Sequence, residues 1–258
     1  MNLSIVVCTK DDMRIQQLLE SIDEDCEVVV VCNGSTSVYR NYVRELLKKT
    51  GLHFVMESIP KPSLSTAREI GTCVASSDKV VHIDTDCVFT KGALAEYDRL
   101  LDVYPAVNGL VRFDYSDRQS KIVADMRSFG LPGMILCPSI GFRKEIRDAI
   151  GDHFFDSRLT WIEDSEFNVR LSKANIPIHE TDGLTCIHEA LTFRRDLISA
   201  FRYGEGVRIA ASYNLHKKRP TANWFLIPPM YRISFLHGVY ALVWNVVYCI
   251  GFYSCFDH

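Results

Sequence analysis

The first 84 residues alternate between short apolar runs and amphipathic segments. The runs "LSIVVCT" (3–9) and "CEVVVVCNGS" (26–35) are apolar almost throughout, which is typical of strands covered on both faces. Similar runs cover residues 52–58 and 79–84, and the segments between the runs place apolar side chains at helical spacing. Strands that alternate with helices predict an α/β fold, with a mostly parallel central sheet flanked by helices.

The pattern loosens after about residue 105. We expect strands over residues 106–115 and 178–189, a strand running into a helix over 134–146, and helices over 161–176 and 191–213.

Composition narrows the classes of partner. The 258-residue chain suits one large domain or two closely joined ones, and its net charge of −3 gives no reason to expect nucleic acid. None of its nine cysteines forms a CxxC pair, and several, such as Cys8 and Cys32, lie inside strand-like runs. They indicate small buried side chains in a reducing compartment, and not a disulfide framework or a zinc site. The stretch "MNLSIVVCTKDD" is not typical of a signal peptide.

The fourth run ends on two carboxylates, Asp84 and Asp86, separated by Thr85. Residues i and i+2 of an extended chain face the same side, so we expect both carboxylates to point into one crevice. Close carboxylates repel unless a cation lies between them or one is protonated, and a hard divalent cation is the natural partner. Ligands of such sheets bind beyond the carboxyl ends of the strands, so the segments holding Thr9, Asn33 and Asp84 should converge. A plain surface turn is the alternative.

A second group of acids lies in "WIEDSEF" (161–167), at an expected helix start where negative charge is favoured anyway. Trp161 offers a flat apolar face for a sugar ring, and a carboxylate beside it could act as general base towards a hydroxyl. His188, in "CIHEA", is either a metal ligand or an ordinary hydrogen-bonded histidine.

The C-terminal run "ISFLHGVYALVWNVVYCIGFYSCF" (233–256) contains no Asp, Glu, Lys or Arg. It is long enough to cross a hydrocarbon core of about 30 Å. Four basic residues and two aromatic residues precede it, a flank that suits an anionic membrane surface; they are Lys217, Lys218, Arg219, Arg232, Trp224 and Tyr231. We expect membrane contact, spanning or interfacial, with a buried helix pair or an oligomerisation surface as alternatives.

Six motifs, taken in order, resemble glycosyltransferase family 2, the inverting enzymes with a GT-A fold. They are "SIVVCTKDD", "VVVVCNGSTS", "STAREIG", "HIDTDC", "WIEDSEFNVRL" and "FRYGEG". The resemblance covers roughly residues 3–210. It implies a Rossmann-like nucleotide-diphospho-sugar transferase with a nucleotide-sugar-binding half (1–105) and an acceptor-binding and catalytic half (106–215). A hydrophobic segment (216–258) would add C-terminal helices that associate with a membrane.

The resemblance also implies roles for single residues. The donor would contact Thr9, Asn33, Arg68, Asp84 and Asp86, and the metal, Mn²⁺ or Mg²⁺, would bind Asp86 and His188. Asp164 would be the catalytic base, and Trp161 and Glu163 would contact the acceptor.

Three departures from the family pattern bear on the donor and on the kind of product. Cys32 and Asn33 stand where family members often have two acids, although an asparagine carbonyl still accepts a hydrogen bond from a base. Glu69 replaces the asparagine of the family's "ARN" helix, and "FRYGEG" is not the signature of processive synthases.

We therefore expect a glycosyltransferase that adds one sugar to a lipid-linked or cell-surface glycan acceptor. It would use a UDP-sugar, with dTDP- or GDP-sugars as alternatives, in the cytoplasm at the cytosolic face of a membrane. The competing interpretations are a sugar nucleotidyltransferase and a non-catalytic module that binds nucleotide sugar at a membrane. The first usually needs a glycine-rich loop after the first strand, and "TKDDMR" has no glycine.

Overall fold

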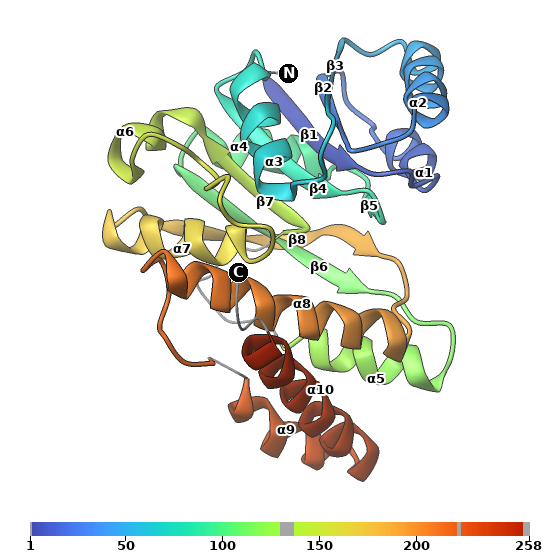
Figure 1. The fold of residues 1–258 in the computed structure, drawn as a ribbon. Helices are drawn as coiled ribbons and strands as arrows, with labels where there is room; N and C mark the ends of the chain where they lie inside the picture. Colours follow the sequence, from blue (N-terminus) through green and yellow to red (C-terminus); the bar gives the residue numbers. More distant parts are fainter. Residues whose placement is uncertain (1, 130–136, 221–222, 255–258) are drawn as a thin grey trace. The chain divides into compact units, whose positions relative to one another are not determined.

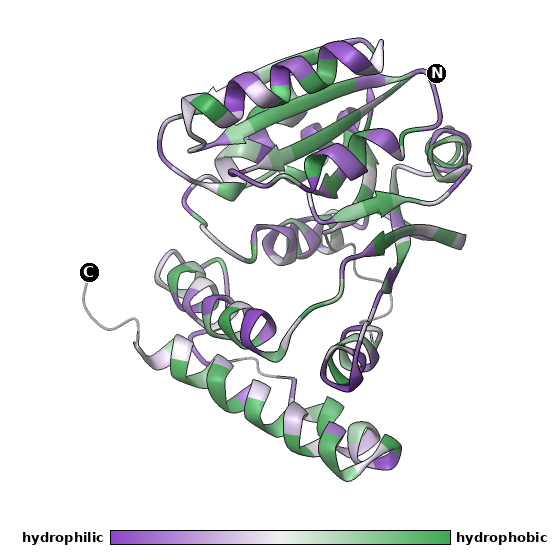
Figure 2. Ribbon diagram, turned by 90° about the vertical axis from the view of Figure 1, so that its right-hand side faces the viewer, coloured by the Kyte–Doolittle hydropathy of each residue, from purple (hydrophilic) through white to green (hydrophobic). Residues whose placement is uncertain are grey.

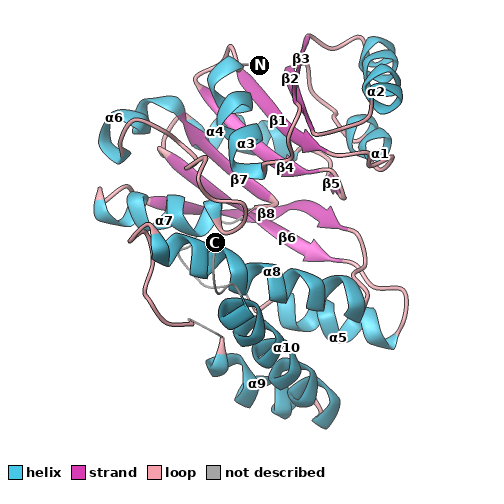
Figure 3. Cartoon of the chain, in the orientation of Figure 1, coloured by secondary structure: helices cyan, strands magenta, loops and turns pink. Residues whose placement is uncertain are grey.

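Eight strands form one sheet in the order β3-β2-β1-β4-β7-β6-β8-β5 in the computed structural model (Figures 1 and 3). The strands are β1 (Leu3–Thr9), β2 (Glu27–Asn33), β3 (Phe54–Ile59), β4 (Lys79–Asp84), β5 (Cys87–Phe89), β6 (Ala106–Phe113), β7 (Ser139–Arg143) and β8 (Ile178–His188). The structure describes residues 2–129, 137–220 and 223–254.

Contacts divide the chain into two units that interleave along the sequence. The first comprises Met1–Val111, Pro132–Arg158 and Glu163–His188, and it holds the sheet. The second comprises Arg112–Leu131, Leu159–Ile162 and Glu189–His258, and its regular structure is helical.

The first four strands are parallel, as the apolar runs predict. β1 pairs with β2 and β4, and β2 pairs with β3. Strands β1, β2 and β4 are buried on both faces, and alternate residues enter two separate cores. Ile5 and Val7 of β1 face one core, whereas Val6 faces the other. This two-sided burial is why the runs are apolar throughout.

Helices supply the two covering layers. The helices of the first unit are α1 (Ile15–Glu20), α2 (Ser37–Thr50), α3 (Leu64–Val74), α4 (Ala93–Leu101), α6 (Arg147–Ile150) and α7 (Glu163–Lys173). Side chains of α1, α2 and α4 fill the core on one face, and those of α3, α6 and α7 fill the core on the other. Gly71 of α3 lies so close to Val6 that a side chain there would overlap it, which brings α3 tightly against β1.

The later strands are antiparallel where their pairing is resolved: β7 with β4 and with β6, and β5 with β8. The mostly parallel prediction thus holds for the first half of the unit. In the second half, strands and helices still alternate along the chain, yet these strand pairs run antiparallel. Residues 134–136 of the expected 134–146 element, and Cys255 and Phe256 of the C-terminal run, lie outside the described residues.

The second unit is built from α5 (Arg118–Arg127), α8 (Phe193–Ser212), α9 (Ile227–Ile233) and α10 (Phe235–Ser254) around a core of its own. A buried polar group lies inside it: Arg127 and Tyr240 both donate to the carboxylate of Asp196, which is 0% exposed. Figure 2 shows α10, the long helix that leads to the C-terminus, as predominantly hydrophobic.

Glycines set the distance between α8 and α10. A Cβ at Gly251 would overlap the carbonyl of Phe201, and a Cβ at Gly204 would overlap the carbonyl of Tyr248. Both obstacles are backbone atoms, which cannot rotate away. The two helices therefore pack backbone to backbone at this crossing.

Gly251→Ala should destabilise the second unit by about 1–3 kcal/mol, because the methyl group would force the helices apart. All three tryptophans, Trp161, Trp224 and Trp244, belong to this unit, so the thermal midpoint of tryptophan fluorescence reports on it. Gly183→Ala in β8 is the matched control, since nothing lies within 4 Å of its Cβ. An unchanged midpoint for Gly251→Ala would contradict this packing.

Candidate active site

The carboxyl ends of β1, β2 and β4 are adjacent, as the sequence predicts. In the parallel register Thr9 lies beside Cys32, and Cys8 lies beside Asp84. The turn after β2 contains Gly34 in the left-handed region (φ 72°), and Ser63 then caps the start of α3. The three strand ends therefore open onto the same edge of the sheet.

Arg68 of α3 binds two acids at this edge. Its Nη2 lies 2.8 Å from Asp84 Oδ1 at the end of β4, and its Nε lies 3.0 Å from Glu163 Oε1 at the start of α7. The arginine is 3% exposed and the Glu163 side chain 4%. A buried guanidinium thus holds together a helix, a strand end and a second helix.

Glu163 and Asp164, called here the "ED" pair, have different surroundings. Burial raises the pKa of Glu163 to about 7, with Arg68 opposing the shift and Asp164 adding to it. Burial also raises the pKa of Asp164, again against the effect of Arg68. Glu163 is buried, whereas Asp164 is partly exposed and is oriented by backbone N–H donors of Ser165 and Cys137. Asp164 is therefore the acid of this pair that a ligand can reach.

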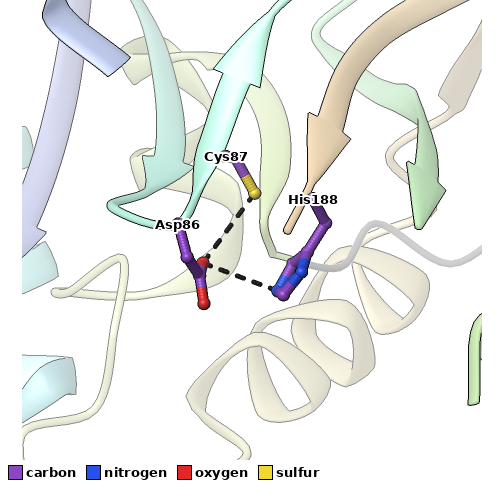
Figure 4. Close-up of side chains that lie close together, drawn as sticks. All are labelled: Asp86, Cys87 and His188. Atoms are coloured by element: carbon purple, nitrogen blue, oxygen red, sulfur yellow. Dashed lines mark hydrogen bonds and ion pairs between the residues drawn. The ribbon is translucent and has the colours of Figure 1, made fainter. Parts of the chain in front are cut away.

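Asp86 and His188 form a second group with Cys87 (Figure 4). The ligand atoms of the three side chains all lie within 4.8 Å of one another, and Asp86 Oδ1 is 3.5 Å from His188 Nε2. The antiparallel ladder is responsible, since it sets Cys87 of β5 directly opposite His188 of β8. A carboxylate suits Mn²⁺ and Mg²⁺ and an imidazole suits first-row divalent ions, so Asp86 and His188 fit the expected metal, whereas the Cys87 thiol is a ligand for softer ions.

Asp84 and Asp86 do not lie on one extended segment, which corrects the expectation that both carboxylates point the same way. The strand ends at Asp84, and Thr85 and Asp86 form a turn before β5, so extended alternation does not continue past Asp84. Asp84 faces Arg68, whereas Asp86 faces His188 and also Arg14, whose Nη1 is 3.6 Å from Asp86 Oδ2. Burial raises the pKa of Asp86, and among its charged neighbours Asp84 adds to the shift while His188 and Arg14 oppose it.

Thr9 and Asn33 are placed at the edge but are already hydrogen-bonded. Thr9 is 1% exposed, and its hydroxyl lies 2.5 Å from the Tyr39 hydroxyl. Asn33 accepts a hydrogen bond from the backbone N–H of Ser63 at 2.7 Å. Its amide NH₂ group and the second lone pair of its Oδ1 are the remaining hydrogen-bonding capacity of that side chain.

Trp161 belongs to the second unit. Its ring meets Tyr203 edge to face at 5.8 Å, and the guanidinium of Arg202 lies 5.3 Å from its centre. The half-buried tryptophan is thus held between two side chains of α8.

Sequence reasoning missed three residues of these groups: Arg14, Cys87 and Cys137. Arg14 sits in the loop before α1, bound to Asp12 at 2.6 Å and near Asp86. Cys137 receives a hydrogen bond from Arg68 and donates its backbone N–H to Asp164. Only Arg14 had a sequence signal, as a basic residue just after the first strand.

The family model for glycosyl transferase family 2 matches residues 4–162. The chain belongs to that family, which confirms the resemblance and makes the protein a glycosyltransferase. The match decides against a sugar nucleotidyltransferase. No curated protein matches the chain.

Solved structures show the fold. S. aureus TarS 1–349 is 17% identical with a TM-score of 0.59, and the match covers 98% of this chain and 91% of that one. The same TarS fragment in complex with UDP-GlcNAc is 15% identical, with the same TM-score and coverage. The mannosyltransferase PcManGT from Pyrobaculum calidifontis, in complex with GDP-Man and Mn²⁺, is 18% identical with a TM-score of 0.63, covering 100% and 76%. The protein has the predicted GT-A fold.

Removing the imidazole of His188 should weaken Mn²⁺ binding at least about tenfold, because the nitrogen ligand is lost. The measurement is a titration of Mn²⁺ followed by electron paramagnetic resonance, without donor. His188→Ala is compared with His53→Ala, which removes a 71% exposed imidazole just before β3, at the opposite end of the strands. Equal Mn²⁺ affinity in the two variants would exclude His188 from the site.

Proposed function

We propose that the protein transfers one sugar from a nucleotide-sugar donor to an acceptor hydroxyl with inversion, and that Asp164 is the base. The observation that carries this proposal is the contrast within the "ED" pair. Glu163 is buried against Arg68, whereas the Asp164 carboxylate is partly open to solvent and fixed by two backbone donors. Glu163, expected to contact the acceptor, suits the positioning of Arg68 better.

The reaction is a single displacement. The acceptor oxygen forms a bond to the anomeric carbon as the bond from that carbon to the diphosphate breaks. The leaving nucleoside diphosphate keeps the electron pair, and the acceptor proton passes to the Asp164 carboxylate. The raised pKa of Asp164 makes it a stronger base than an ordinary aspartate.

The donor would lie across the carboxyl ends of β1, β2 and β4. Asn33 and the strand end at Thr9 would hold the nucleoside, Asp84 the ribose, and Arg68 would hold Asp84 in place. TarS in complex with UDP-GlcNAc and PcManGT in complex with GDP-Man support a nucleotide-sugar donor. We propose a UDP-sugar, with GDP- and dTDP-sugars as the alternatives.

Asp86 and His188 would hold Mn²⁺ or Mg²⁺, as their donor atoms and spacing suggest. A bound divalent ion would offset the charge that develops on the departing diphosphate. Arg14 lies on the other side of Asp86 and adds a fixed positive charge there.

The acceptor is proposed to be lipid-linked or part of a cell-surface glycan, at the cytosolic face of a membrane. The support is α10, whose length and mean hydropathy of 1.5 are sufficient to cross a bilayer. Trp161 would stack on the acceptor sugar.

Asp164→Asn should reduce transfer at least about a thousandfold, because the amide cannot take the acceptor proton. Donor binding should stay nearly intact, because the substitution is isosteric. Transfer is measured as labelled sugar from UDP-sugars incorporated into native membrane lipid, and binding as the change in Tm with UDP. Asp182→Asn, on an exposed position of β8, is the control. Full transfer by Asp164→Asn would remove the base assignment.

The pH dependence provides an independent test. The base acts only when ionised, so transfer should fall as pH drops through the pKa of Asp164, which lies above the ordinary 3.8. Because the pKa of Glu163 is about 7, that side chain is already largely neutral over the acid limb of the pH profile, so Glu163→Gln should leave the limb nearly in place. A limb that moves to lower pH in Glu163→Gln would show that Glu163 is ionised beside Asp164 and would contradict this assignment. The measurement is the pH profile of kcat/KM for both proteins.

A further inference from the structure

One face of α10 is apolar and exposed along the whole helix. Seven large hydrophobic side chains on it are 40–72% exposed, namely Phe235, Leu236, Leu242, Val243, Val246, Ile250 and Tyr253. No charged residue occurs in the helix. In the described part of the chain, α10 is the helix long and apolar enough to cross a membrane, yet only 44% of its most apolar 18-residue stretch is buried.

The opposite face of α10 is fixed to α8. The contacts follow both helices in the same direction, from Phe193 stacked on Tyr240 to Arg208 over the ring of Phe252. Between them lie the glycine contacts of Gly204 and Gly251. Tyr240 also donates to the buried carboxylate of Asp196. The two helices thus form one body over most of their length.

This attachment decides how α10 can meet a bilayer. If α10 crossed the hydrocarbon core in this fold, α8 would cross beside it with six charged residues: Arg194, Arg195, Asp196, Arg202, Glu205 and Arg208. Each charge at the centre of a bilayer is costly, by about 3 kcal/mol even on insertion scales. A helix that lies in the plane of the interface buries its apolar face and leaves α8 out of the hydrocarbon.

The flank of α10 shows what kind of surface it suits. Residues 213–254 contain no Asp or Glu, and their four Lys and Arg residues, Lys217, Lys218, Arg219 and Arg232, are all exposed. Trp224, Phe225 and Tyr231 beside them are 41–56% exposed. Aromatic and basic residues next to an apolar face match the headgroup region of an anionic membrane.

We infer that the second unit docks in the plane of an anionic membrane surface through the exposed face of α10 and the basic, aromatic segment before it, without crossing the bilayer. This deepens the proposed membrane association and rests on it. A lipid-linked acceptor would then reach the docked enzyme by diffusing within the plane of the membrane.

The test is flotation of the full chain with vesicles of phosphatidylcholine containing about one third phosphatidylglycerol. The protein should float with these vesicles and much less with phosphatidylcholine alone. Val243→Glu with Val246→Glu should lower the partition coefficient at least about tenfold, because two charges enter the docking face. The matched control is Val38→Glu on α2, which changes a 79% exposed valine in the first unit. Replacing Lys217, Lys218 and Arg219 with alanine should remove the preference for anionic lipid.

Two further measurements distinguish interfacial docking from a membrane-spanning α10 and from a dimer interface on this face. Alkaline carbonate should release the protein from native membranes, whereas retention would show that α10 spans them and would overturn the inference. Sedimentation without vesicles should give a monomer, whereas a dimer abolished by Val243→Glu with Val246→Glu would assign the face to a second copy. Absence of flotation would also overturn the inference.

Flotation needs no donor, so a failed donor titration would count against the proposed reaction alone. Circular dichroism confirms that each variant is folded.

Discussion

The buried guanidinium of Arg68 is the interaction on which the acidic edge of the sheet depends. It joins α3 to the end of β4 through Asp84 and to the start of α7 through Glu163. Removing one partner of a buried ion pair leaves an uncompensated charge, at a cost of about 3–5 kcal/mol. The position of α7, and with it that of Asp164, therefore depends on a residue of another helix. Asp86 takes part in neither ion pair of Arg68 and, together with His188, remains available for a cation.

The parallel half of the fold could be predicted from sequence because its physical cause is local. Strands buried on both faces must be apolar throughout, and Ile5, Val6 and Val7 show this by entering opposite cores in turn. Helix ends also have local causes, since Ser63 is a typical N-cap residue and caps α3, and Gly51 is a typical residue after a helix and ends α2. The antiparallel half could not be predicted in this way. Its pairings join segments far apart in sequence, and no periodicity reveals which strands meet.

Some residues of the candidate site could likewise be predicted from local sequence, whereas others depend on contacts between distant segments. Asn33 and Asp84 are the last residues of β2 and β4, and Asp86 lies in the turn after β4, so all three could be found from the order of the elements. The approach of Cys87 to His188 comes from a ladder between β5 and β8, about a hundred residues apart, so nothing in either local sequence indicates it. Likewise, "IED" does not reveal that Glu163 is buried and Asp164 accessible, because this follows from the packing of Arg68. For α10 the sequence indicated an apolar run, whereas its attachment to the charged helix α8 emerges only in three dimensions.

A thermal-shift experiment tests whether the carboxyl ends of β1, β2 and β4 bind a nucleotide sugar with a divalent ion. Tm is measured with UDP-, GDP-, dTDP- and CMP-sugars, with and without Mn²⁺. A ligand at about a hundred times its Kd stabilises the fold that binds it by about 2.7 kcal/mol. We expect a rise in Tm for UDP-sugars that is larger when Mn²⁺ is present. Folded protein whose Tm does not move with any of the four classes would contradict nucleotide-sugar binding at this edge.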